Sequence, residues 1–319
     1  MAVLVGIDEA GFGPILGPLV VSSSAFSVPE HLAKADIWQV LRRSIGYSRR
    51  HLAGRLLITD SKKAYSKKIG TRHLKHTVLA CLKYLDENPV TLSELLSFLC
   101  PDLLERLQDY PWYKGSGDYE ISVDEPSVLI ASEVLRDDTA SNNIKLLELK
   151  SCCLDVWRYN RMVSVVKNKS TVLFTATCRL IKHAFDNFAA DGLHIIVDRM
   201  SGRVHYRRIL QRMFPDMQLK IMCERQTKSS YELKTDGKSM HLHFIVKADE
   251  KILPTSLASM VSKFLRELLM ENINRYFAHH CADIRPTAGY WKDGLRFIED
   301  LQNNGADSHI NMEQLVRCK

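Results

Sequence analysis

The sequence predicts an α/β protein in which helices flank a mixed β-sheet. Two apolar runs, residues 3–7 and 193–197, end on the aspartates Asp8 and Asp198, as strands buried on both faces do. An amphipathic helix is predicted over 168–190, where apolar residues recur every three to four positions. Strands that alternate with helices in this way are typical of the α/β class.

Composition indicates a globular protein with an acidic partner. The chain has 319 residues, of which 45% are hydrophobic, so we expect one domain over 1–319 with a substantial core. A formal net charge of +7 favours a partner such as nucleic acid. Eight cysteines without a Cys-x-x-Cys or zinc spacing favour reduced thiols and a cytoplasmic protein. Because no basic region precedes the first apolar run, a signal peptide is not expected. Glycines, prolines and serines in the uncharged stretch 10–28 favour turns and strand over a membrane helix, so no membrane association is expected.

The N-terminal third predicts two strands followed by helices. Residues 2–8 and 16–28 read as strands joined by the glycine and proline turn at 11–14. A helix is expected over 30–43. Asp60 or Ser61 then caps a helix that carries 73–85, which places Lys62 and Lys63 at a helix start where backbone amides favour anions.

Residues 86–319 are expected to contain an insertion, further strands of the sheet and a helical C-terminal region. Residues 86–165 indicate a largely helical insertion or small lobe, with helices over 91–107 and 126–136 and a possible surface for a protein partner. A helix up to Met213 follows the second acidic strand. Strands are expected near 217–223, 229–234 and 240–247, and the C-terminal region 254–319 is expected to be helical.

Asp8 and Glu9 are adjacent acids at the end of a buried strand, where carboxylates are costly unless something positive meets them. Divalent cations such as Mg²⁺ are held by carboxylates together with substrate phosphates. A solvated pair at a strand end is the alternative. Asp198 would join the pair if its strand neighbours the first, and the converging carboxylates would then repel one another without a metal.

Several motifs resemble the type 2 ribonuclease H (RNase HII) family, and they occur in the family's order. The matched positions lie within 1–85 and 168–295, whereas 86–165 has no counterpart. The matching elements are Asp8-Glu9-Ala10-Gly11-Phe12-Gly13-Pro14, Asp60-Ser61-Lys62-Lys63, Ile195-Ile196-Val197-Asp198, Lys247-Ala248-Asp249, the segment from Ala258 to Glu267, and Gly289-Tyr290.

The resemblance implies a ribonuclease H-like fold and hydrolysis of the RNA strand of RNA–DNA hybrids by a two-metal-ion mechanism. It implies that Mg²⁺ or Mn²⁺, as two ions, is held by four catalytic acids: Asp8, Glu9, Asp198 and Glu267. The assignment of Glu267 comes from the resemblance alone. Positions expected to contact the substrate are Gly11, Phe12, Gly13, Ser61, Lys62, Lys63, Arg203, Lys263 and Tyr290.

The chain departs from the family pattern in three places. Phe12 replaces the arginine of the Gly-Arg-Gly motif, which in the family helps to read the ribose 2′-hydroxyl beside the scissile bond. Glu267 replaces an aspartate, which moves the carboxylate by one methylene where magnesium geometry is strict. The segment 223–247 and the insertion exceed the family's connections. These differences indicate a divergent member.

Three other interpretations compete. Gly11-x-Gly13 after a strand suggests a dinucleotide site, but Pro14 and Pro18 lead into another strand rather than a helix. A nuclease of the same fold that acts on another nucleic acid is the second, and Phe12 favours it. A catalytically weakened nucleic-acid-binding protein is the third, and the retained acids argue against it.

Overall fold

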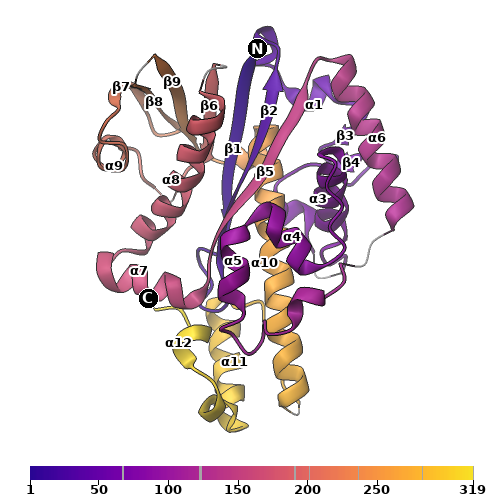
Figure 1. Cartoon of the computed structure of the whole chain (residues 1–319), viewed down its shortest axis with the longest axis vertical. Helices are drawn as coiled ribbons and strands as arrows, with labels where there is room; N and C mark the ends of the chain where they lie inside the picture. Colours follow the sequence, from indigo (N-terminus) through magenta and orange to yellow (C-terminus); the bar gives the residue numbers. More distant parts are fainter. Residues whose placement is uncertain are drawn as a thin grey trace.

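A mixed β-sheet forms the centre of the computed structural model (Figure 1), which describes all residues except 67, 122–123, 190–191, 201, 236, 282 and 319 and the side chains of 307 and 309. In this part of the chain seven strands form the sheet, in the order β5-β2-β1-β6-β9-β8-β7. They are β1 (Ala2–Ala10), β2 (Leu19–Val28), β5 (Lys145–Leu154), β6 (Leu193–Asp198), β7 (Gln218–Glu224), β8 (Lys228–Thr235) and β9 (Lys238–Ile245).

Parallel pairing at the middle of the sheet positions the acids. β1 runs parallel to β6, with Ile7 opposite Val197, and β6 runs parallel to β9. The other neighbouring strands are antiparallel. Because the carboxyl ends of parallel strands meet at one edge, Asp8 and Asp198 lie side by side there, which confirms the predicted α/β class and the predicted neighbouring of these strands.

Helices cover both faces of the sheet (Figure 1). α10 (Leu253–His280) crosses β1 and β2 so closely that a Cβ on Gly6 would lie 2.1 Å from the carbonyl carbon of Pro254. α8 (Lys169–Phe188) covers the opposite face, where Val172 and Ile181 pack against strand residues such as Ile7. α7 (Val156–Val166) and α9 (Arg207–Met213) extend this second layer.

A helical lobe packs beside α10. Three further helical elements form the C-terminal part of the chain. The lobe contains α3 (Arg72–Tyr84), α4 (Leu92–Leu99), α5 (Pro101–Leu107) and α6 (Glu125–Ser141). The C-terminal part contains α11 (Trp291–Asn303), η4 (Ala306–His309) and α12 (Met312–Leu315). Smaller elements are η1 (Glu30–Leu32), α1 (Ile37–Val40), α2 (Ser61–Ala64), η2 (Ser116–Asp118), η3 (Ala248–Glu250) and the paired β3 (Ile45–Gly46) and β4 (Leu56–Leu57).

The helix expected over 30–43 is wrong. Only η1 and α1 form, because residues 41–46 leave the helix and Ile45 pairs with Leu56 of β4. Asp60 caps the short α2 instead of the helix over 73–85, which begins separately at Arg72. The other expected strands and helices occur within a few residues of their predicted bounds, except that 91–107 divides into α4 and α5 at Pro101.

The segment 86–165 is not entirely a helical insertion. Its residues 145–154 form β5, the edge strand that pairs with β2 from Leu19↔Leu154 onward. Cross-strand contacts such as the 2.8 Å hydrogen bond between the hydroxyls of Ser22 and Ser151 hold it in the main sheet. The helical lobe therefore occupies the part before β5. Within the described residues, no helix is long and apolar enough to cross a membrane.

Candidate active site

Four carboxylates gather at the edge of the sheet where β1, β6 and β9 end. Asp8 and Glu9 lie near the end of β1, and Asp198 is the last residue of β6. Asp249 follows β9 in η3 and is buried, with 8% of its surface exposed, while Asp8 is 6% exposed. The amide of Ala248 donates to Oδ1 of Asp198 at 2.6 Å, which ties η3 to the end of β6.

The pKa values of the first two acids are raised. Burial, followed by the charges of Glu9 and Asp198, holds the pKa of Asp8 well above its usual range. Burial together with Asp198 raises the pKa of Glu9 to about 7, although Lys62 opposes the shift. Each carboxylate thus disfavours ionisation of the other, as expected of like charges in a poorly solvated site.

Asp198 and Asp249 belong to the same electrostatic group. Burial raises the pKa of Asp198, although the amides of Ala248 and Arg199 counteract it. Burial and the charge of Asp198 raise the pKa of Asp249 to about 6. We call Asp8, Glu9, Asp198 and Asp249 the acid cluster.

The motif at 60–62 supplies the cluster with a cation. Asp60 caps α2 by accepting from the amide of Lys62 at 3.0 Å. The Ser259 hydroxyl donates to that of Ser61 at 3.0 Å, which fixes α2 against α10. Partial burial alone would lower the pKa of Lys62, but Asp60 and the nearby Asp249, Asp8 and Asp198 raise it. Lys62 therefore faces the acid cluster.

The structure does not bring Glu267 to the acid cluster. Its Oε1 accepts from Nζ of Lys263 at 2.6 Å and lies 3.5 Å from Nη1 of the buried Arg266. Lys263 in turn lies over the ring of Tyr65, 4.7 Å from its centroid. This corrects the sequence-based grouping, because the turn of α10 that carries Glu267 faces Tyr65 and two cations.

Asp249 is the acid that sequence reasoning missed. The motif Lys247-Ala248-Asp249 is one of the elements that match the family, and it contains this aspartate. Asp249 follows Lys247, a non-glycine residue with φ of +55°, and this turn directs the chain from β9 back toward Asp198. The close relation to Asp198 became visible only once the strand order was known.

The turn after the acid pair is held by buried arginines. Gly11 has φ of +91°, and a Cβ there would lie 2.7 Å from Nε of Arg266. Phe12 is half-buried and packs against the core under α8, with Nζ of Lys169 5.5 Å from its ring centroid. Open space surrounds the Cβ position of Gly13. Phe12 thus fills a packing position, while the backbone at Gly13 is accessible.

The other residues predicted to contact the substrate fall into two groups, one beside the acid cluster and one beside Glu267. Lys63 forms a 3.3 Å ion pair with Glu250, directly after Asp249. Tyr290 is half exposed under the guanidinium of Arg266, 5.7 Å from its ring centroid. Arg203 lies near the rings of Phe174 and Tyr206 at 5.8 and 5.7 Å. Lys62, Lys63 and Ser61 therefore lie beside the acids, whereas Lys263 and Tyr290 accompany Glu267.

The carboxylate oxygens of the acid cluster are suitable ligands for hard divalent cations. Carboxylate oxygens are the ligands that Mg²⁺ and Mn²⁺ prefer, and a dication would offset both the burial and the mutual repulsion that raise the pKa values. Across the described residues, no three His, Cys, Asp or Glu side chains lie together so that they could hold a metal ion. The four acids are close enough to affect one another's ionisation without converging on a point.

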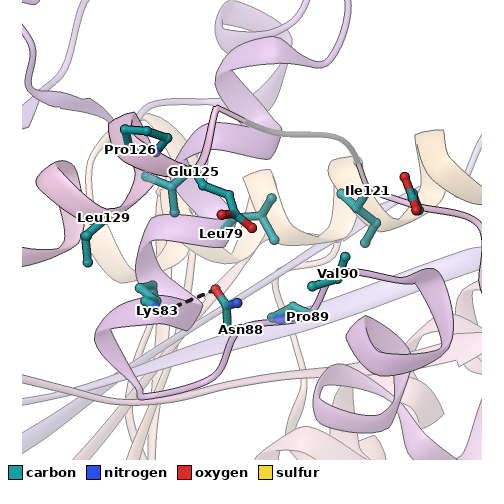
Figure 2. Close-up of a pocket in the computed structure, with 11 residues that line it drawn as sticks. Leu79, Lys83, Asn88, Pro89, Val90, Ile121, Glu125, Pro126 and Leu129 are labelled. Carbon is teal, nitrogen blue, oxygen red and sulfur yellow. Dashed lines mark hydrogen bonds between the residues drawn. The ribbon is translucent and has the colours of Figure 1, made fainter.

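A separate pocket of about 530 Å³ lies in the helical lobe (Figure 2). Leu79 and Lys83 of α3, Val90, and Leu129 of α6 line it, and Nζ of Lys83 donates to Asn88 at 3.4 Å. The predicted site residues do not line this pocket. It is thus distinct from the acid cluster.

Comparisons with known proteins give matches among solved structures alone. No protein-family model and no curated protein matches the chain. The chain is similar to Bst-RNase HIII in complex with Mn²⁺ (15% identity over 99% of this chain and 66% of that chain, TM-score 0.48). It is also similar to RNase HII of Archaeoglobus fulgidus from a PCNA:RNase HII complex (18%, 99% and 94%, 0.45) and to Aquifex aeolicus RNase H3 (13%, 98% and 71%, 0.45). The chain therefore spans just under two thirds of the Bst-RNase HIII chain.

Proposed function

We propose that this protein is a metal-dependent endonuclease of the ribonuclease H type that hydrolyses the RNA strand of RNA–DNA hybrids. The observation that carries the proposal is that Asp8, Glu9, Asp198 and Asp249 lie at one sheet edge beside Lys62, close enough to shift one another's pKa values. Mutually repelling buried carboxylates are expensive unless cations meet them. The motifs around them, Asp-Glu-Ala-Gly and Asp-Ser-Lys-Lys, support the same reaction class.

The residues of the chain have separable roles in this proposal. The acid cluster would hold two divalent ions, which supply an activated water and stabilise the leaving oxygen. Asp198 is oriented by the amide of Ala248, and Asp8 is fixed by the Ser262 hydroxyl, which donates to its backbone carbonyl at 3.0 Å. Lys62 would contact a phosphate next to the scissile bond.

Glu267 takes a different role in the proposal from the one first predicted for it. Paired with Lys263, it would set the position of that lysine over the ring of Tyr65, from where the lysine would contact the sugar–phosphate backbone. Phe12 keeps open the alternative of another nucleic-acid substrate, because no arginine is offered to a ribose 2′-hydroxyl at this position. A protein partner on the helical lobe also stays a prediction.

An activity assay tests the proposal. The protein is incubated with Mg²⁺ or Mn²⁺ and four substrates: an RNA–DNA hybrid, a single ribonucleotide in duplex DNA, double-stranded RNA and a DNA junction. We expect cleavage of the hybrid, with Asp8→Asn and Asp198→Asn losing at least about 100-fold in rate. Asp186→Asn, in an exposed pair with Lys182 on α8, is the matched control. Equal cleavage by parent and site variants would refute the proposal, as would no cleavage of any substrate.

A further inference from the structure

Charge is distributed unevenly along this chain. Residues 42–76 contain eleven Lys or Arg and one acid, Asp60, which gives this segment a formal net charge of +10. Residues 86–138 contain thirteen acids and three Lys or Arg, a net charge of −10. A polyanion would therefore be attracted to the first segment and repelled by the second.

Part of the positive segment lines a cavity of about 590 Å³. On one side is the loop between β3 and β4, with Leu52, Gly54 and Arg55. The first turns of α3 form the other side, and the start of α6 closes it. We call this cavity the basic cleft; its charged and titratable lining consists of Arg55, Arg72, His73, Lys75, His76 and Asp124.

Several arginines lie close together around the basic cleft. Among the described residues, neither Arg49 nor Arg72 forms an ion pair. Arg55 donates to the carbonyls of Leu52, His51 and Arg42. Burial, and next the charges of Arg72 and Arg49, lower the pKa of His73, which indicates that these arginines crowd one place. Such crowding is unfavourable until an anion enters.

The start of α3 adds to this preference for anions. The Thr71 side chain does not cap the helix, and the first turn carries Arg72, His73 and Lys75 without an acid. Acidic side chains are favoured at a helix N-terminus, and basic ones are disfavoured there. The backbone amides of this turn and the cations beside them therefore favour the same ligand, a phosphate group.

The basic cleft is connected to the acid cluster by a short stretch of chain. α2, with Lys62 at the acids and Lys63 paired to Glu250, leads within seven residues to the start of α3. Tyr47, at the base of the β3–β4 loop, accepts from Nζ of Lys63 at 3.2 Å. Both sites thus belong to one positive surface, with the catalytic edge at one end.

We propose that the basic cleft binds the phosphate backbone of the nucleic-acid substrate at a distance from the bond that is cut. The inference rests on the proposed nuclease function. It adds a second anchoring point on residues 47–76, so that the enzyme distinguishes long duplexes from short ones. Residues 86–138, with their net charge of −10, repel the duplex, which therefore extends from the cleft away from most of that segment.

The test measures binding without catalysis. Affinities of the metal-free protein for 8-bp and 24-bp RNA–DNA hybrids are determined by fluorescence anisotropy over a range of salt concentrations. For Arg49→Ala/Arg72→Ala we expect roughly tenfold weaker binding of the 24-bp hybrid and a salt slope smaller by about 1.8, from two lost phosphate contacts. The 8-bp hybrid should lose much less affinity. Both side chains are exposed, so folding should be preserved.

Lys238→Ala is the matched control, because Lys238 is exposed at the start of β9, at the end of the sheet opposite the acids. It should match the parent protein. An equal salt slope for the double variant and this control would overturn the inference. Asp8→Asn separates the two proposals: it should lose cleavage but keep length-dependent binding. If the parent binds by length and cuts nothing, the proposed function fails and the basic cleft stands.

Discussion

Arg317 donates from Nε to the carbonyl of Gly17 at 2.7 Å, across 300 residues of sequence. Its Nη1 also donates to the carbonyl of Gly11, and the side chain is buried over the ring of Tyr159. These contacts fasten the C-terminal segment to the turn that follows Asp8 and Glu9. Arg266 holds the other side of the same turn through the carbonyls of Leu16 and Ala288.

Arg317→Met should destabilise the protein by about 2–3 kcal/mol. The substitution keeps much of the apolar volume but leaves the carbonyls of Gly11 and Gly17 without charged donors in a buried place, at about 1–3 kcal/mol for each unsatisfied group. Removal of a buried charge offsets part of this cost. Urea unfolding monitored by circular dichroism measures the change, with the exposed Arg212→Met as control. Equal midpoints would show that the hydrogen bonds contribute nothing net.

Asp249→Asn and Glu267→Gln should differ in metal dependence. Asp249 shares the electrostatic environment of Asp198, whereas Glu267 is neutralised by Lys263. We expect Asp249→Asn to reduce the cleavage rate by about 100-fold or more and to weaken Mn²⁺ binding in calorimetry. Glu267→Gln should change Mn²⁺ affinity by less than about threefold. The reverse order would restore Glu267 as the fourth metal-binding acid.

The sequence predicted the acid pair and its partner strand because a short apolar run that ends on an acid indicates both the buried strand and the acid at its end. It could not place Glu267, since the direction of a side chain on α10 depends on how that helix crosses β1, a contact made through Gly6 and Pro254. β5 was missed because Lys145–Leu154 is an edge strand with a half-exposed, charged face, which resembles a surface helix in composition. Long-range packing decided both.

Acidification should remove the contribution of His243 to stability, whereas the raised pKa values of the acid cluster act in the opposite direction. Burial and the neighbouring Lys228, His194 and His241 lower its pKa to about 3, and its Nδ1 lies 2.9 Å from the Ser230 hydroxyl. The folded state therefore binds fewer protons than the unfolded state, whose histidine titrates near 6.5. The contribution of neutral His243 to stability is fully present above that pH and is lost as the pH falls toward 3, by about 2 kcal/mol between pH 8 and pH 5.

His243→Gln should reduce this loss, whereas the exposed His31→Gln should leave it unchanged. The measurement is the free energy of unfolding in urea at several pH values between 5 and 8. The same pH slope in the parent and in His243→Gln would show that another group carries the dependence.

Phe12→Arg should raise the selectivity for a ribonucleotide–deoxyribonucleotide junction over a uniform hybrid. The half-buried ring of Phe12 contacts the core and offers no hydrogen bond, whereas an arginine at this exposed turn could donate to a ribose hydroxyl. A hydrogen-bond donor of this kind contributes about 1–2 kcal/mol of discrimination, so the ratio of kcat/KM values should rise by roughly 5- to 30-fold. Phe12→Leu, which keeps an apolar side chain, should leave the ratio unchanged. Because Lys169 lies near the ring, Phe12→Arg should be compared with Phe12→Arg/Lys169→Ala, in which the repulsion is removed. An unchanged ratio in both variants would exclude position 12 from substrate selection.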